Sequence, residues 1–136
     1  MKVTTERLRI ACAAAALLVS ACGGGGSTPT APSGGGGGTP TSGATITIGS
    51  NGAVSPAQVT INVGQSVTFV NNDRRTHDMA SDPHPAHTDC LPMSPAGNLI
   101  PGATKSTNAF TSARTCGFHD HSNPDTAGLK GSIVIR

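Results

Sequence analysis

The chain has 136 residues, with nine Lys and Arg against seven Asp and Glu, five histidines, three phenylalanines, and neither Tyr nor Trp. Three of the basic residues lie within the first nine positions, so the remainder is close to neutral. A near-neutral remainder without a basic stripe excludes a surface built to bind nucleic-acid phosphates. The chain also shows no assembly of nucleophile and general base, and we do not expect an enzyme.

The N-terminal segment has the layout of an export signal. Basic residues precede the apolar run 10–19, which is too short for a membrane-spanning helix of roughly 20 residues. The residues Val19-Ser20-Ala21-Cys22 that follow resemble the bacterial lipoprotein box. We therefore expect residues 1–21 to be a signal peptide and Cys22 to be lipidated. The protein would then lie in the cell envelope, facing the periplasm or the cell surface, attached to the membrane by its lipid anchor only.

Two further regions follow the signal. Residues 22–43 are rich in Gly, Pro, Ser and Thr and have no apolar periodicity, which is typical of a flexible linker. Residues 44–136 are long enough for one small core, and we expect them to form a single monomeric domain.

Short segments of alternating polar and apolar residues dominate this domain. They are separated by turn residues, whereas residues 73–100 are polar and proline-rich and are expected to form a long loop. This spacing predicts an all-β fold, a Greek-key antiparallel β-sandwich. The expected strands are 44–48, 59–63, 66–70, 103–110 and 131–136.

Candidate metal ligands gather in two places. Cys116, His119 and His121 lie within six residues near the C-terminus, and His77 lies in the predicted loop. Thiolate and imidazole together suit copper in both of its oxidation states, so copper is the expected cofactor. Further candidate ligands in the predicted loop are Met79, His84, His87 and Cys90.

The domain resembles the cupredoxins, the plastocyanin and pseudoazurin group of copper proteins. The resemblance rests on residues 63–72 followed by His77, on Leu99-Ile100-Pro101-Gly102, and on Cys116-x-x-His119 ahead of the last strand. It implies one copper held by His77, Cys116 and a second histidine. It also implies one-electron transfer to a partner protein that the sequence does not identify.

The sequence departs from the family pattern at two points. The methionine that serves as a weak axial ligand in the family aligns with Pro124 or, if the longer loop is skipped, with Leu129. Two methionines elsewhere in the domain, Met79 and Met93, are the remaining axial candidates. The second histidine is His119 if the spacing follows plastocyanin and His121 if it follows azurin.

Three alternatives stay open at this stage. Cys90 and Cys116 are the only cysteines in the domain, and exported proteins usually pair their cysteines. A disulfide between them would leave no thiolate, and the histidines would then form a copper-handling or storage site without the blue colour. A metal-free structural sandwich is the third reading.

Overall fold

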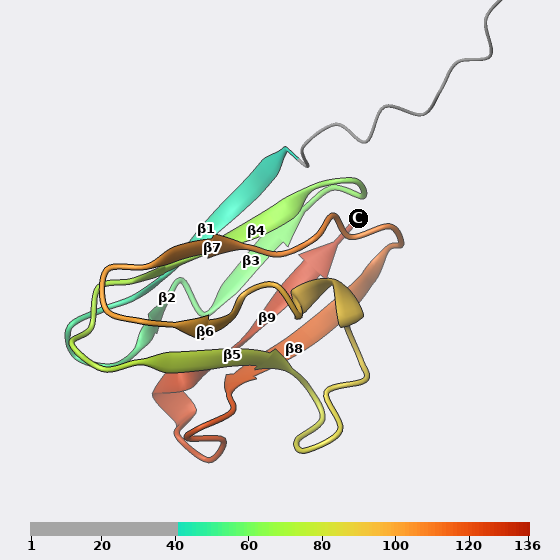
Figure 1. Cartoon of the computed structure of the whole chain (residues 1–136). Coiled ribbons are helices and arrows are strands. Elements are labelled where there is room, and N and C mark those ends of the chain that lie inside the picture. The colour runs from blue at the N-terminus through green and yellow to red at the C-terminus, as the bar shows by residue number, and fades with distance from the viewer. Residues whose placement is uncertain (1–40) are drawn as a thin grey trace, which may run out of the picture. The chain divides into compact units, whose positions relative to one another are not determined.

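The computed structural model describes residues 41–136, so the predicted signal peptide, Cys22 and nearly all of the predicted linker lie outside the described residues. Within 41–136, no helix is long and apolar enough to cross a membrane. The described part is built from strands and two short 3-10 turns (Figure 1). In chain order these are β1 (Ser42–Ile48), β2 (Val54–Ser55), β3 (Gln58–Ile61), β4 (Ser66–Asn71), β5 (His77–Ser81), η1 (Leu91–Met93), β6 (Gly97–Leu99), β7 (Thr104–Ser106), β8 (Arg114–Asp120), η2 (Ala127–Leu129) and β9 (Lys130–Ile135).

The strands form two sheets, in the orders β2-β1-β4-β7 and β3-β9-β8-β5-β6. The predicted all-β sandwich is confirmed. The prediction of purely antiparallel pairing is wrong for two pairs, because β1 runs parallel to β4 and β3 runs parallel to β9. Both sheets are therefore mixed.

The core follows from the alternation of side chains along the strands. Ile46 and Ile48 of β1 and Val67 and Phe69 of β4 are fully buried, while the intervening residues are more exposed. Phe69 meets Phe118 of the other sheet edge to face, with ring centroids 5.4 Å apart, so an aromatic pair joins the two layers. All three phenylalanines of the chain are buried.

Residues 73–100 are not the single loop that the sequence predicts. They contain β5, which pairs with β6 on one side and with β8 on the other. β5 was hidden from sequence reasoning because its letters, HDMAS, are mostly polar, yet His77, Met79 and Ser81 are all buried. The loop that remains, residues 82–90, connects β5 to η1 (Figure 1), and at its start the Asp82 amide bonds to the Gly117 carbonyl of β8.

The predicted ligand segment also lies on a strand for most of its length. Cys116 and His119 belong to β8, which is paired with β9 from Arg114 to His119. The predicted strand 103–110 is much shorter in the structure, where only Thr104–Ser106 pair with β4.

Candidate metal centre

Cys116 is joined to Cys90 by a disulfide, with a Cα–Cα distance of 5.9 Å. This corrects the prediction that Cys116 is a copper ligand and that Cys90 is a further one, because a sulfur in a disulfide has no thiolate to offer a metal. Both cysteines are buried in the core. The bond links the end of the 82–90 loop to the middle of β8, and it is the alternative pairing that the cysteine count had left open.

His77 and His119 face opposite sides of the same sheet. In the pairing of β5 with β8, Met79 lies opposite Asp120 and Ala80 lies opposite His119. Because side chains alternate between faces, His77 shares the core face with Met79, whereas His119 lies on the other face. The structure therefore does not bring the predicted set of His77, Cys116 and His119 together around one metal ion.

His77 is instead enclosed in a hydrogen-bonded network with two carboxylates. Its Nδ1 lies 2.9 Å from Asp120 Oδ2 and its Nε2 lies 3.1 Å from Asp73 Oδ2, and all three side chains are buried. Both ring nitrogens of His77 are therefore engaged by carboxylates. A metal at either nitrogen would have to displace one of these buried carboxylates, so the residues at His77 do not fit a copper ion.

The two carboxylates are held in the ionised form. Burial raises the pKa of Asp73, but hydrogen bonds from the Arg74 amide, His77 and Arg75, together with the charge of Arg75, outweigh it and bring the pKa down to about 2. For Asp120, burial also acts upward, yet its hydrogen bonds prevail and the pKa is lowered. The donors to Asp120 are the amides of Asp78 and Ser122 and the side chains of His77 and Asn123.

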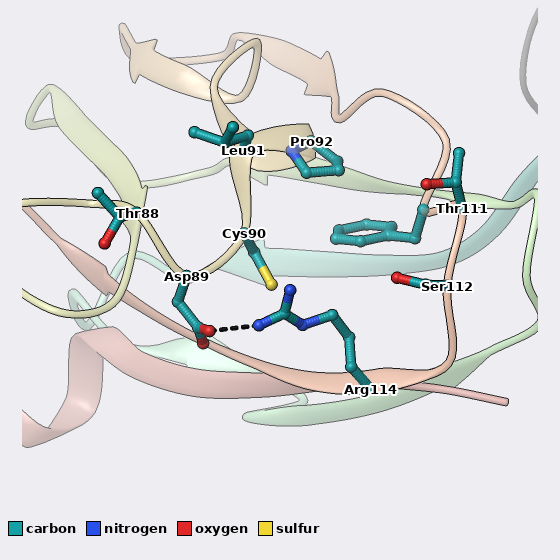
Figure 2. Close-up of a pocket in the computed structure, with 9 residues that line it drawn as sticks. Thr88, Asp89, Cys90, Leu91, Pro92, Thr111, Ser112 and Arg114 are labelled. Atoms are coloured by element: carbon teal, nitrogen blue, oxygen red, sulfur yellow. Dashed lines mark hydrogen bonds and ion pairs between the residues drawn. The ribbon is translucent and has the colours of Figure 1, made fainter.

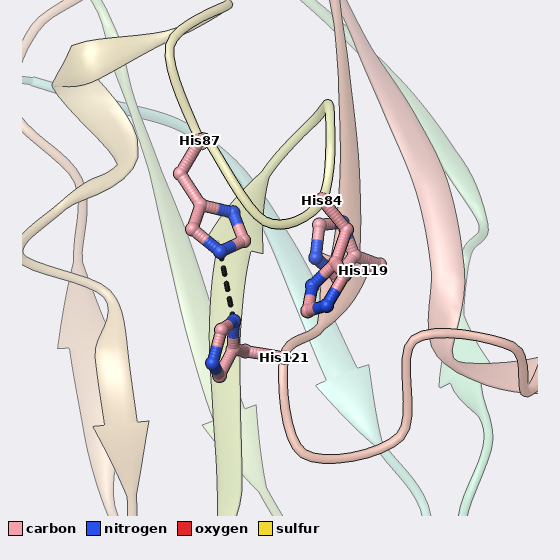
Figure 3. A group of neighbouring side chains, drawn as sticks. All are labelled: His84, His87, His119 and His121. Carbon is pink, nitrogen blue, oxygen red and sulfur yellow. Dashed lines mark hydrogen bonds between the residues drawn. The ribbon is translucent and has the colours of Figure 1, made fainter.

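The other four histidines of the chain form one cluster (Figure 3). His84 and His87 come from the 82–90 loop, while His119 and His121 come from the end of β8 and the residue after it. One ligand nitrogen from each lies within 4.8 Å of all the others. Sequence reasoning had placed two of them with His77 and two in a secondary role. The structure unites all four and leaves His77 and Met79 out.

His119 is arranged as a metal ligand in two respects. Its Nδ1 lies 2.6 Å from Asp82 Oδ1, and its Nε2 is the one buried side-chain nitrogen or oxygen in the described residues without a hydrogen-bond partner. A carboxylate behind a histidine fixes the tautomer that leaves the far nitrogen free for a metal. An unpaired buried nitrogen is costly unless a ligand completes it. The orphaned Nε2 therefore supports metal binding at this cluster.

A glycine makes room for that carboxylate. A Cβ atom on Gly117, two residues before His119 on β8, would collide with the Asp82 carboxylate. The backbone amide of Asp82 also donates to the Gly117 carbonyl, at 3.1 Å. Gly117, two residues before the candidate ligand His119, was therefore the sequence feature that could have indicated a neighbouring carboxylate. Sequence reasoning did not use it.

His87 is fixed just as tightly. Its Nδ1 lies 2.7 Å from the carbonyl oxygen of Ser81, so Nδ1 carries a hydrogen and donates it to that oxygen. Nε2 lies 2.8 Å from His121 Nδ1, inside the cluster (Figure 3). The backbone of His87 has a φ of 52°, a left-handed conformation that is rare outside glycine and concentrates at functional sites.

His84 is exposed and borders a cleft. Its pKa is lowered, first by desolvation and then by the neighbouring histidines His121, His119 and His87, with Asp125 opposing them. A lowered pKa favours the neutral imidazole, which is the form that binds metals. The cleft has a volume of about 620 Å³, and its lining consists of Asp82, Pro83, His84, His119, Pro124, Asp125 and Lys130.

A second, smaller cavity of about 220 Å³ lies near the disulfide (Figure 2). Arg114 and Asp89 form an ion pair there, beside the sulfur of Cys90. This pair joins the 82–90 loop to β8 close to the disulfide, so the far end of the loop has two attachments to the strand. The cavity contains none of the histidines.

No protein-family model and no curated protein sequence matches the chain. Solved structures do match residues of the described domain. A purple cupredoxin from Nitrosopumilus maritimus is 20% identical, with a TM-score of 0.55, over 68% of this chain and 99% of that one. An oxidised plastocyanin from Dryopteris crassirhizoma is 19% identical, with a TM-score of 0.53 and the same coverage. A methionine-to-alanine mutant of amicyanin with Cu(I) is 17% identical, with a TM-score of 0.52, over 69% of this chain and 82% of that one.

These identities are low and establish the fold alone. The two mixed sheets form a sandwich of the cupredoxin-like kind. The ligands are a separate matter, because the disulfide and the His77 network occupy the residues on which the sequence resemblance had placed copper. The chain thus has the cupredoxin fold, with a candidate metal centre on a different face of its sheet.

Proposed function

We propose that this protein binds and handles a transition metal, copper in the first place, through His84, His87, His119 and His121. The observation that carries the proposal is the convergence of four imidazole nitrogens within 4.8 Å, one of them buried and unpaired. Side chains from two separate segments thus converge on one point, where His87 Nε2 and His121 Nδ1 are 2.8 Å apart and His119 Nε2 is left without a partner that a metal would supply.

Copper is favoured by the chemistry of the donors. Imidazole suits copper, zinc, iron and nickel, and among divalent ions the affinity of a given nitrogen site is highest for Cu²⁺. The amicyanin structure that shares this fold contains Cu(I). Zinc is the natural competitor, since histidine is also one of its common ligands.

The site supports metal handling better than electron transfer of the blue-copper kind. That colour and reactivity need a thiolate ligand beside two histidines, and the only cysteines of the domain are bonded to each other. The bound Cu²⁺ form should accordingly lack strong absorption at about 600 nm. A partner that receives or supplies metal takes the place of the redox partner expected from the sequence.

The location of this function rests on the N-terminal sequence. Residues 1–21 have the features of a signal peptide and Cys22 those of a lipidation site. Under the proposal, the domain binds metal in the cell envelope, where exported proteins keep their disulfides. Labelling cells with a radioactive fatty acid tests the anchor, and Cys22→Ala should abolish the label.

The decisive experiment is a metal titration of the full chain against a competing chelator, first with Cu²⁺ and then with Zn²⁺. We expect one bound equivalent. Loss of a hydrogen-bond partner behind a ligand typically costs about 10–100-fold in affinity, so His119→Gln, which removes a ligand itself, should cost at least about 100-fold.

The matched control is His77→Gln, at the one histidine outside the cluster. This variant should be less stable but should keep its metal affinity, measured under conditions where circular dichroism shows that it is folded. If folded His77→Gln loses affinity and His119→Gln does not, the metal is not held by the four-histidine cluster and the proposal is wrong.

A further inference from the structure

The four histidines of the cluster are not held equally. The ring of His119 is fixed by Asp82 and the ring of His87 by the Ser81 carbonyl. The backbone amide of His121 donates to the Asp78 carbonyl at 2.7 Å, which ties this residue to β5. Three members of the cluster are therefore attached to the rigid sheet or to its immediate neighbours.

His84 lacks attachments of this kind. Within residues 41–136 neither its ring nor its backbone makes a hydrogen bond, and the residue is exposed. It lies between Pro83 and Pro85, neither of which has an N–H to donate, and the backbone bond of this turn runs past it, from the His87 amide to the Pro83 carbonyl. Its ring reaches the cluster from the loop side (Figure 3).

The cleft lies beside this same residue. His84 and His119 both line it, together with Asp82, Asp125 and Lys130. A molecule entering the cleft from solvent therefore reaches the ligand side of the cluster next to the one histidine that is loosely held. Two carboxylates against one ammonium group disfavour small anions here and favour a neutral donor such as imidazole.

We propose that His84 is the exchangeable ligand of the cluster, and that an imidazole donor entering through the cleft takes its place, so that metal passes between this protein and a histidine-bearing partner. The inference rests on the proposed function and names how the same site works. Three fixed histidines keep the metal bound while His84 leaves, and the cleft supplies the path for the incoming donor. Exchange requires no electron transfer and no covalent bond other than those of the ligands.

The test is chemical rescue in the full chain, using Zn²⁺ as the metal and free imidazole as the probe. His84→Ala should weaken binding by no more than about 10-fold, whereas His119→Ala should weaken it by at least about 100-fold. Millimolar imidazole should restore the affinity of His84→Ala and leave that of His119→Ala low. His84 is exposed on a loop, so its variant is expected to fold.

A second readout follows the rate of exchange. Metal release to a chelator in stopped flow should be faster for the wild-type chain when imidazole is added, and His84→Ala should release metal faster still. Equal losses for His84→Ala and His119→Ala, with no selective rescue, would overturn the exchange proposal while leaving metal binding intact. Failure of the wild-type chain to bind metal at all would instead overturn the proposed function, and exchange with it.

Discussion

Replacing Asp73 with asparagine tests whether the His77 network is a structural ion pair. The change keeps the shape of the side chain and removes its negative charge. Asp73 accepts hydrogen bonds from the Arg74 amide at 2.7 Å, from Arg75 Nε at 2.9 Å and from His77 Nε2 at 3.1 Å. The asparagine amide would leave the buried His77 ring with only one carboxylate.

The magnitude follows from the burial of each partner. Arg75 is 67% exposed, so its ion pair contributes at most about 1 kcal/mol. His77 is 1% exposed and Asp73 is 6% exposed, and removing one partner of such a buried pair costs about 3–5 kcal/mol. We expect the free energy of unfolding to fall by about 3 kcal/mol, which for a domain of this size lowers the Tm by about 12–24 °C.

A double-mutant cycle measures the coupling between Asp73 and His77. It uses urea unfolding of the wild type, Asp73→Asn, His77→Gln and the double variant. The coupling energy should be at least about 1 kcal/mol. Asp78→Asn is the matched control, because within the described residues the Asp78 carboxylate takes no hydrogen bond. A coupling near zero, at unchanged m-values, would refute the ion pair and reopen His77 as a free ligand.

Three further predictions follow from the same geometry. The pKa values of Asp73 and Asp120 are lowered in the folded state, so the stabilisation from both groups is complete above the unfolded value of 3.8 and is lost as the pH falls below it, for Asp73 towards about 2. Urea midpoints should drop over this range, and less steeply in Asp73→Asn. Asp82→Asn should weaken metal binding by about 10–100-fold in the chelator titration, and Asp125→Asn should not. Reducing the disulfide, which spans 26 residues, should cost about 3.5 kcal/mol in thermal or urea unfolding. Added Cu²⁺ should still give no absorption at about 600 nm, because Cys116 faces the core and not the histidine cluster.

The sandwich was accessible from the sequence because the two inner strands of its smaller sheet, β1 and β4, carry a clear period of two. Residues 44–48 and 66–70 alternate apolar and polar letters, and both segments are strands in the structure. β5 was not accessible, because its buried positions hold a histidine and a serine whose hydrogen bonds, not their hydropathy, keep them inside. Parallel pairing of β1 with β4 also leaves no local signature, since it depends on contacts distant in sequence.

The sequence indicated the candidate ligands near the C-terminus but combined them with the wrong histidine, because the register between β5 and β8 is not visible in it. Ser81 pairs with Phe118, so Cys116 lies about six residues, or about 20 Å, from His77 along the strands. In this C-terminal segment, the residues that contact or support the His77 network are Asp120 and Asn123, which have the same spacing as Cys116 and His119 but lie four positions later. Spacing alone cannot distinguish two such pairs, and only strand pairing decides which one faces His77.

The two faces of β8 explain how one short motif supports two separate sites. Its inward residues are Cys116, Phe118 and Asp120, and these form the disulfide, the aromatic contact between the sheets and the ion pair with His77. Its outward residues are Gly117 and His119, and these admit the Asp82 carboxylate and present a free nitrogen to the loop histidines. The inward side chains already make the contacts that stabilise the sandwich. Copper binding on that face would therefore require breaking those contacts. The outward set carries no such cost, since its unpaired nitrogen gains a partner when a metal binds.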